Sequence, residues 1–141
     1  TYSPWRAYGT SKLANLLFTA ELERRMKAAG MSAIAVAAHP GYTATNLGAA
    51  AAAASGNAVQ TRIMALGERL IAQSAEMGAL PTLYAATDPH VSGGAFIGPD
   101  GIGGMRGYPT KVARSKAASD SSVARRLWSV SEQLTGVSYL D

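Results

Sequence analysis

Hydrophobic residues recur every three to four positions in the first part of the chain, which is the spacing of an amphipathic helix. The side chains predicted to form its apolar face are Leu13, Leu16, Leu17, Phe18, Ala20, Leu22, Met26 and Ala29. The charged side chains predicted to face water are Glu21, Glu23, Arg24, Arg25 and Lys27. The basic residues gather toward the C-terminal end of this pattern, where the helix dipole favours positive charge.

The residues that flank this pattern indicate where the helix begins and ends. Ser3 can cap the first turn, and Pro4 suits the first helical position, where a backbone N–H has no partner within the helix. Gly30 can adopt the left-handed conformation that often follows the last helical residue. The predicted helix therefore runs from Pro4 to Ala29.

Short apolar runs and further amphipathic segments follow. Residues 33–38 are apolar on both alternating faces, which is typical of a strand buried in a parallel sheet between two layers of helices, and Pro40-Gly41 ends this strand. The other predicted elements are a helix from Ser74 to Thr87, capped by Ser74 and bent at Pro81, a short buried strand from Gly94 to Gly98, and a helix from Val123 to Thr135 that stops at Gly136. Together these elements predict an α/β fold.

The last of these helices also has a predicted apolar face. Its members are Ala124, Leu127, Trp128, Ser131 and Leu134. Trp128 is interpreted as a packing anchor, because a large aromatic side chain at helical spacing contributes mainly through the area that it buries.

Two glycine-containing segments separate the elements. Residues 48–57 are rich in glycine and alanine, apolar residues then recur at helical spacing up to Ile71, and the region is predicted to form a mobile flap over a substrate. A membrane-surface helix is the alternative, but residues 49–54 lack the bulky apolar and basic faces that such a helix needs. Residues 101–107 do not match a phosphate-binding loop, because Arg106 stands where its third glycine would fall and no helix follows, so a flexible connection is predicted.

Composition narrows the class of protein. The 141 residues carry a formal charge of +4, but the basic residues form no dense block with interleaved aromatics, so a nucleic-acid interface is not predicted. The chain has no cysteine, which suits a cytoplasmic location and excludes thiolate metal sites. His39 and His90 have no carboxylate at ligand spacing, so no metal site is expected. No apolar stretch approaches the ~20 residues of a membrane span, and Thr1 to Ala7 do not have the charged-then-apolar pattern of a leader, so neither feature is expected.

Candidate chemistry lies on the first helix. Tyr8 and Lys12 are four residues apart, so they share one helix face, and the phenol and the ammonium can be held close together. A phenol titrates near ~10 in solution, and a fixed cation beside it favours the ionised form that acid–base catalysis at neutral pH requires. The alternative is a tyrosine at the edge of the core with a solvated lysine one turn away, which suits any amphipathic helix.

The residues around this pair point to a family. Tyr8-Gly-Thr-Ser-Lys-Leu-Ala-Asn15, the predicted strand and then His39-Pro-Gly-Tyr-Thr-Ala-Thr-Asn-Leu47 resemble, in order and spacing, the C-terminal half of a short-chain dehydrogenase/reductase. The chain is most similar to the branch that contains retinol dehydrogenases and light-dependent protochlorophyllide reductases. That similarity extends to Gly78-Ala-Leu-Pro-Thr-Leu-Tyr-Ala-Ala86 and Arg125-Arg-Leu-Trp-Ser-Val-Ser131.

The resemblance implies a fold and a set of site residues. It implies the C-terminal half of a doubly wound, Rossmann-type parallel sheet, with residues 1–141 forming part of one domain. Tyr8 would be the general acid/base and would also contact the cofactor, and Lys12 would tune Tyr8 and bind the nicotinamide ribose. Pro40 and Gly41 would let the backbone approach the nicotinamide. Main-chain groups of Thr43 and the hydroxyl of Thr45 would complete the cofactor site, although an aliphatic residue is usual at the first of these positions.

The same resemblance implies partners. The cofactor would be NADP, with NAD as the other possibility, and the substrate a small alcohol or carbonyl compound. The glycine-rich phosphate turn and the family's catalytic serine and asparagine would lie upstream of Thr1, so the chain would need the N-terminal half of the fold. A homodimer or larger oligomer is expected. The alternative function is a non-catalytic fragment with a structural or interaction role, whose exposed sheet edge a partner chain must cover.

Overall fold

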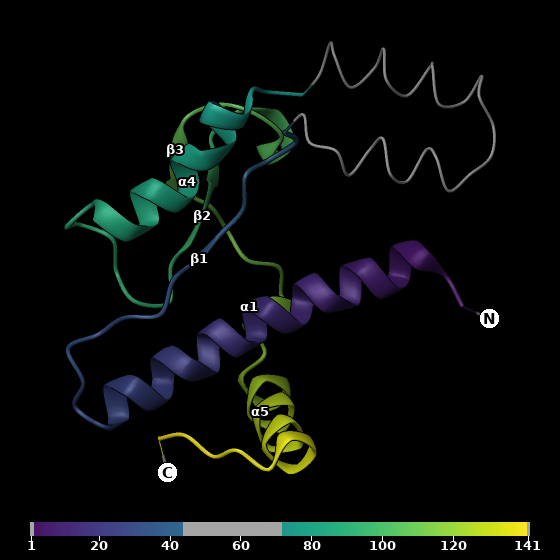
Figure 1. The fold of residues 1–141 in the computed structure, drawn as a ribbon, viewed down its shortest axis with the longest axis vertical. Coiled ribbons are helices and arrows are strands. Elements are labelled where there is room, and N and C mark those ends of the chain that lie inside the picture. The colour runs from purple at the N-terminus through teal and green to yellow at the C-terminus, as the bar shows by residue number, and fades with distance from the viewer. Residues whose placement is uncertain (1, 44–71, 141) are drawn as a thin grey trace. The chain divides into compact units, whose positions relative to one another are not determined.

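The computed structural model describes residues 2–43 and 72–140 (Figure 1), so Thr45 and the predicted flap up to residue 71 lie outside the described residues. The elements are α1 (Pro4–Ala28), β1 (Ala37–Ala38), α4 (Ala75–Thr87), β2 (Phe96–Pro99), the 3₁₀ turn η1 (Ile102–Gly104), β3 (Pro109–Lys111), the 3₁₀ turn η2 (Ala117–Ser119) and α5 (Ser121–Thr135).

The chain divides into two compact units, and each is described by itself. The helical unit contains α1, η2 and α5, from the segments Thr1–Ala37, His90–Phe96 and Ala113–Asp141. The turn unit contains α4, η1 and β3, from the segments Ala38–Pro89 and Ile97–Val112. Strands β1 and β2 begin in the first unit and end in the second.

Helix α1 begins at Pro4 as predicted and ends at Ala28, one residue before the predicted end, but the predicted side-chain cap is absent. Gly30 has a φ of 68°, and the amide of Met31 donates to the carbonyl of Met26 at 3.0 Å, which is the bond of a Schellman ending. At the other end the Ser3 side chain makes no capping hydrogen bond, so the predicted cap is wrong. Its carbonyl still accepts the first helical bond, from Ala7. Pro4 at the first position removes one unpaired donor, which makes a side-chain cap less necessary.

Helix α5 packs against α1 in the helical unit (Figure 1). Trp128 is 4% exposed, and its ring stacks on Phe18 with 5.4 Å between the centroids, so its predicted role as a packing anchor is confirmed. Leu134 was predicted to share the buried face, but it is 82% exposed and that expectation is wrong. The contact with α1 uses the turns around Ala124 and Trp128 and leaves the last turn of the helix in solvent.

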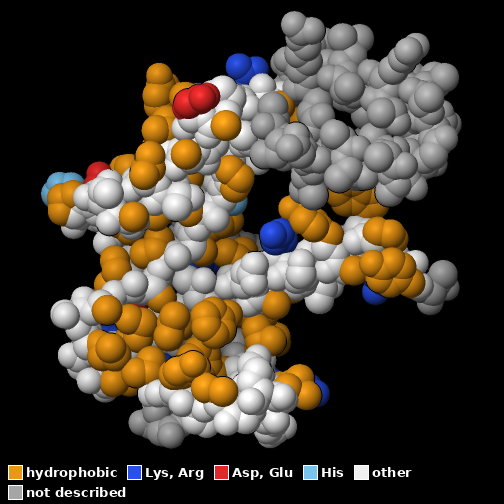
Figure 2. Space-filling view, in the orientation of Figure 1, with side chains coloured by type: hydrophobic (Ala, Val, Ile, Leu, Met, Phe, Trp, Pro, Cys, Tyr) orange, Lys and Arg blue, Asp and Glu red, His pale blue; other side chains and the backbone are white. Residues whose placement is uncertain are grey.

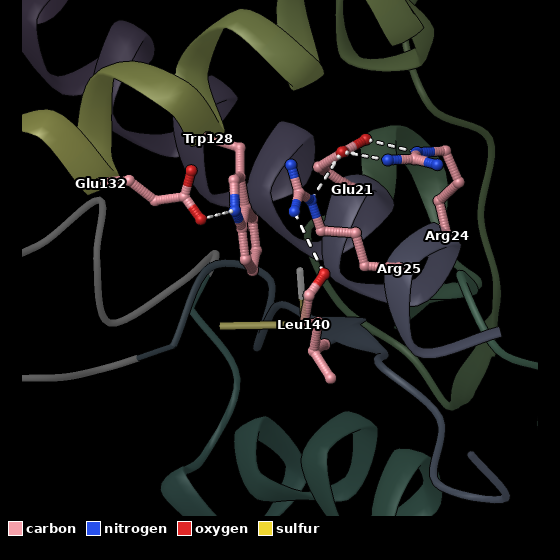
Figure 3. A network of polar contacts seen from close by, with 6 residues as sticks. All are labelled: Glu21, Arg24, Arg25, Trp128, Glu132 and Leu140. Atoms are coloured by element: carbon pink, nitrogen blue, oxygen red, sulfur yellow. Dashed lines mark hydrogen bonds and ion pairs between the residues drawn. The ribbon is translucent and has the colours of Figure 1, made fainter. Parts of the chain in front are cut away.

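A buried carboxylate lies on the face of α1 that was predicted to be polar and solvated (Figure 3). Glu21 is only 1% exposed, although the helical pattern placed it in water. Arg24 donates two hydrogen bonds to its carboxylate, at 2.8 and 2.6 Å, and Arg25 donates a third at 3.0 Å. The hydrogen bonds from Arg24 hold the pKa of Glu21 below its ordinary value, against the opposing effect of burial. Glu21 can be buried because its neighbours neutralise it.

Arg25 extends this network to α5 and the C-terminal segment. Its guanidinium lies over the ring of Trp128, 4.7 Å from the centroid, and also donates to the carbonyl of Leu140 at 3.2 Å. The indole N–H of Trp128 in turn donates to Glu132 at 2.7 Å (Figure 3). The stretch of α1 predicted to be solvated thus organises the packing of the helical unit.

The sheet is small and mixed, with strand order β1-β2-β3. The amides of Ala37 and His39 donate to the carbonyls of Ala95 and Ile97, at 3.0 and 2.9 Å, which is the stepwise pattern of a parallel pair. Strands β2 and β3 are antiparallel, with Ile97 opposite Lys111. The described residues therefore form an α/β arrangement of a partial Rossmann-like fold. The expected half of a doubly wound, parallel sheet is confirmed only in part, because the three described strands form a mixed sheet.

The first predicted strand is much shorter than residues 33–38. Only Ala37 and Ala38 have strand structure, because the amide of Ala35 donates to the Glu23 carboxylate at 2.8 Å in place of a neighbouring strand. Among the described residues no strand is bonded to the other edge of β1, and Ile34 is 48% exposed just before it.

Residues 101–107 form an ordered hairpin connection, so the predicted flexible connection is wrong. The amides of Asp100 and Gly101 donate to the carbonyls of Tyr108 and Arg106, each at 2.9 Å, and the Asp100 side chain accepts from the amide of Tyr108. These bonds bring the chain back as β3, a strand with no counterpart in the sequence prediction. Its pattern is hidden by Pro109 and by its length of three residues.

Helix α4 agrees with the prediction. The Ser74 hydroxyl accepts a hydrogen bond from the amide of Met77 at 3.4 Å, and the helix continues through Pro81 to Thr87.

Figure 2 shows hydrophobic side chains gathered over α5 and the adjoining part of α1 on the face in view. No helix in the described part of the chain is both long and apolar enough to cross a membrane.

The Glu21 network gives the first prediction. Glu21→Gln is expected to lower the free energy of unfolding by about 1–3 kcal/mol at pH 7, because an amide replaces a buried carboxylate that accepts hydrogen bonds from two guanidinium groups. Urea unfolding measures this change. Glu76→Gln is the comparison at an exposed site: hydrogen bonding with Ser74 in the first turn of α4 also lowers the pKa of Glu76, but its loss should cost less than that of buried Glu21.

Measuring the stability of these variants at several pH values separates the contribution of the Glu21 charge from that of packing. Because the pKa of Glu21 is lowered in the folded state, its contribution is present above the unfolded value, about 4.3, and is lost as the pH falls through the folded value. The stability difference between wild type and Glu21→Gln should therefore shrink below about pH 4.3. Equal unfolding midpoints at pH 7 would contradict the proposed importance of the ion pairs.

Candidate functional site

Tyr8 and Lys12 lie side by side on α1, as helical spacing predicted. The ammonium of Lys12 is 5.3 Å from the centroid of the Tyr8 ring, within reach of a cation–π contact. Trp5 packs edge-on against the same ring at 6.4 Å, and the hydroxyl of Ser11 donates to the carbonyl of Tyr8. The tyrosine ring is therefore held between an aromatic side chain and a cation.

This pair is open to solvent, since Tyr8 is 51% exposed and Lys12 is also exposed. The exposed part of the phenol is consequently accessible to a small molecule. A phenol with an ammonium nearby can give a proton to, or take one from, an oxygen that approaches it. Acid–base chemistry is what this arrangement offers.

The second group of predicted residues forms a tight turn after β1, in the turn unit. The carbonyl of Pro40 accepts hydrogen bonds from the side chains of Thr43, at 3.0 Å, and Gln73, at 2.6 Å. The amide of Tyr42 donates to the carbonyl of Met105 at 2.6 Å, which fastens the turn to the 101–107 loop. Pro40, Gly41 and Thr43 are thus brought together, whereas Thr45 lies outside the described residues.

Two glycines allow this turn to pack closely. Gly41 has a φ of 70°, and a Cβ there would lie 2.4 Å from the carbonyl oxygen of Met105. On the other side, a Cβ at Gly78 of α4 would lie 2.4 Å from the hydroxyl oxygen of Thr43. The need for glycine at position 41 therefore already follows from packing within the protein.

His39 supports the same turn from the end of β1. Its Nδ1 accepts a hydrogen bond from the amide of Gly41 at 3.2 Å, so this nitrogen is unprotonated in the structure. A Cβ at Gly98 would lie 2.0 Å from Nε2, which shows how closely the ring packs on β2. Burial lowers the pKa of His39 and favours the neutral form that can accept this bond.

Sequence reasoning missed Gln73. Its side chain is buried and contacts the turn at Pro40 and the loop at Gly107. Nothing in the local sequence marks it, because a glutamine just before a helix cap is ordinary. Within residues 2–43 and 72–140, no group of three or more His, Asp or Glu side chains could hold a metal ion.

Comparisons with known proteins show which proteins this chain is similar to. No protein-family model matches it. It is 34% identical over 139 residues to retinol dehydrogenase 13 of Homo sapiens, covering 96% of this chain and 38% of that protein. It is 35% identical over 138 residues to polyprenol dehydrogenase of Mus musculus, covering 96% of this chain and 37% of that protein.

One solved structure is also similar. A crystal structure of an uncharacterised protein from Mycobacterium paratuberculosis superimposes with a TM-score of 0.70 at 42% sequence identity, covering 99% of this chain and 42% of that one. The chain therefore spans about two fifths of the length of the proteins that it matches.

The packing of Gly41 gives a prediction about stability. Gly41→Ala is expected to lower the free energy of unfolding by about 2 kcal/mol or more, because alanine pays ~1–2 kcal/mol for the left-handed conformation and its Cβ would press on a backbone carbonyl. Thermal and urea unfolding measure the loss. Gly9→Ala is the control: no atom lies within 4 Å of a Cβ there, so alanine should stabilise α1 by about 0.5–1 kcal/mol. Equal effects of the two changes would refute the packing argument.

Proposed function

Since the chain belongs to the short-chain dehydrogenase/reductase family, as its similarity to these dehydrogenases along nearly its whole length shows, we propose that it is the C-terminal part of an NAD(P)-dependent oxidoreductase. The proposed reaction interconverts an alcohol and a carbonyl compound, or reduces a related double bond. The observation that carries the proposal is the Lys12 ammonium 5.3 Å from the ring of an exposed Tyr8.

In this reaction Tyr8 is the proton carrier. During oxidation its phenolate oxygen takes the hydroxyl proton of the alcohol, and during reduction the phenol returns that proton to the carbonyl oxygen. A bound nicotinamide supplies or accepts the hydride, so the proton and the hydride leave the substrate by different routes. Lys12 stabilises the negative charge of the tyrosine oxygen and binds the nicotinamide ribose.

The turn after β1 is proposed to hold the nicotinamide. The amide of Gln73 bonds to the carbonyl of Tyr42, the residue before Thr43, in a parallel bridge between Thr43 and Gln73. Since successive main-chain groups of an extended segment point to opposite sides, the amide and carbonyl of Thr43 point away from Gln73. They are the groups that the carboxamide would meet, with Pro40 and Gly41 beside them and the Thr45 hydroxyl as a further contact. NADP is the proposed cofactor, with NAD as the other possibility.

The remaining parts of the site are proposed to lie elsewhere in a longer protein, because the chain covers about two fifths of its relatives. The glycine-rich phosphate turn, the catalytic serine and the asparagine belong to that part. Self-association, as a homodimer or a larger oligomer, and a cytoplasmic location are retained as proposals. Retinol and polyprenol, the alcohols in the names of two relatives, are the first substrates to assay.

A structural or interaction role is the second candidate function. The exposed edge of β1 and the half-exposed Ile34 beside it favour this reading, because such an edge can pair with another chain. It differs from the first candidate in requiring no catalysis even when the rest of the fold is present.

The proposed acid–base pair is tested in the full-length protein. Tyr8→Phe should reduce turnover by ~10²–10⁴-fold and leave cofactor affinity nearly unchanged, because only the proton carrier is lost. Lys12→Ala should impair both turnover and cofactor affinity. Tyr139→Phe, at an exposed tyrosine near the C-terminus, is the matched control and should behave as wild type. Wild-type turnover in Tyr8→Phe would reject the assignment.

A further prediction follows from the proposal that part of the cofactor site lies outside residues 1–141. Residues 1–141 alone should neither bind NADPH tightly nor catalyse, because only Lys12 and the turn after β1 would contact the cofactor. Calorimetry with NADPH, before and after adding the N-terminal part of the same protein, measures this dependence. Binding that arises only after the addition would support the proposal, and micromolar binding by residues 1–141 alone would overturn it.

A further inference from the structure

Gln73 is a buried polar side chain with both ends of its amide in use. It is 6% exposed, and its Nε2 donates to the carbonyl of Pro40 at 2.6 Å while its Oε1 accepts from the amide of Gly107 at 3.1 Å. The orientation of the amide is fixed by its partners, since a carbonyl can only accept and an amide N–H can only donate. The side chain therefore spans from the turn after β1 to the 101–107 loop.

The backbone of Gln73 holds the same turn at a second point. Its amide donates to the carbonyl of Tyr42 at 2.9 Å, and its position pairs with Thr43 in a parallel bridge. The turn is thus held by Gln73 at Pro40 and at Tyr42, while the amide of Tyr42 is held by Met105. Gln73 consequently bonds to the turn at two points and to the 101–107 loop at a third, beside the direct bond between Tyr42 and Met105.

Few side chains can replace this one. Glutamate has the same length, but its carboxylate has no proton to give to Pro40 and places a negative charge against that carbonyl. Leucine has a similar shape and can make neither bond, which leaves buried polar groups without partners. Asparagine keeps both groups but is one methylene shorter. The double contact therefore requires a glutamine.

We propose that Gln73 is a positioning residue, which holds the Pro40–Thr43 turn in the conformation that receives the nicotinamide and directs the main-chain groups of Thr43 toward its carboxamide. The inference rests on the proposed function, because it names a residue that acts on the cofactor through the turn. A turn that shifts by about 1 Å would misplace the nicotinamide, and a misplacement of that size can reduce a rate by roughly 10²-fold.

The expected signature is a loss confined to the nicotinamide end of the cofactor. In the full-length protein, Gln73→Leu and Gln73→Glu should each lower kcat with NADPH by roughly 10–100-fold, because hydride transfer depends on nicotinamide position. Affinity for 2′-phospho-ADP-ribose, which has no nicotinamide, should stay within about twofold of wild type, because the turn does not contact that part. Gln133→Leu and Gln133→Glu, at an exposed glutamine on α5, are the matched controls and should leave both quantities unchanged.

A second measurement examines the turn without any cofactor. Hydrogen exchange at the Tyr42 amide, which is bonded to Met105, should be faster in the Gln73 variants than in the Gln133 variants. If Gln73→Leu does not fold, Gln73→Asn supplies the test and should show the same losses in smaller measure.

The outcomes separate this inference from the proposed function. If the wild type turns over substrate and the Gln73 variants behave like the Gln133 controls, the positioning role is wrong. The proposed function is not contradicted by that result. Equal losses of kcat and of 2′-phospho-ADP-ribose affinity would also overturn it, because they indicate general damage to the fold. A wild-type protein without nicotinamide-dependent turnover would overturn the proposed function and this inference with it.

Discussion

A buried polar side chain has to be given hydrogen-bond partners, and each of the two units meets this requirement at one position. Glu21 in the helical unit is surrounded by guanidinium groups, and Gln73 in the turn unit bridges a turn and a loop. Because an unsatisfied buried polar group costs about 1–3 kcal/mol, the partners of each residue are fixed in place along with it. Arg25, which is bonded to Glu21, also contacts the ring of Trp128 and the carbonyl of Leu140.

The elements that local sequence determines were predictable. Helix α1 ends at the glycine that was expected to end it, α4 begins at its serine cap, and α5 ends at Gly136 with a left-handed conformation. Each of these signals acts within a few residues of the chain. The start of α5 was placed two residues late, because Asp120 caps the helix by accepting bonds from Ser122 and Val123, and this aspartate was not considered.

The features that depend on distant residues were not predictable. The burial of Glu21 depends on α5 lying against α1, strand β3 depends on a hairpin closed by Asp100, and the first strand is short because Glu23 takes the amide of Ala35. The candidate site divides in the same way. Helical spacing alone brings Tyr8 and Lys12 together, whereas the contacts of the turn with Met105, Gly78 and Gln73 arise only from the fold.

The parallel bridge between Thr43 and Gln73 closes the chain at the base of the segment that joins them. The flanking residues keep their positions through bonds to each other and to neighbouring loops, so they do not depend on the length of the intervening chain. The entropic cost of holding two chain positions together rises by only about 0.6 kcal/mol for each doubling of the number of residues between them. The number of residues between Thr43 and Gln73 can therefore change at little cost to this bridge, and the Pro40–Thr43 turn can keep its shape when it does.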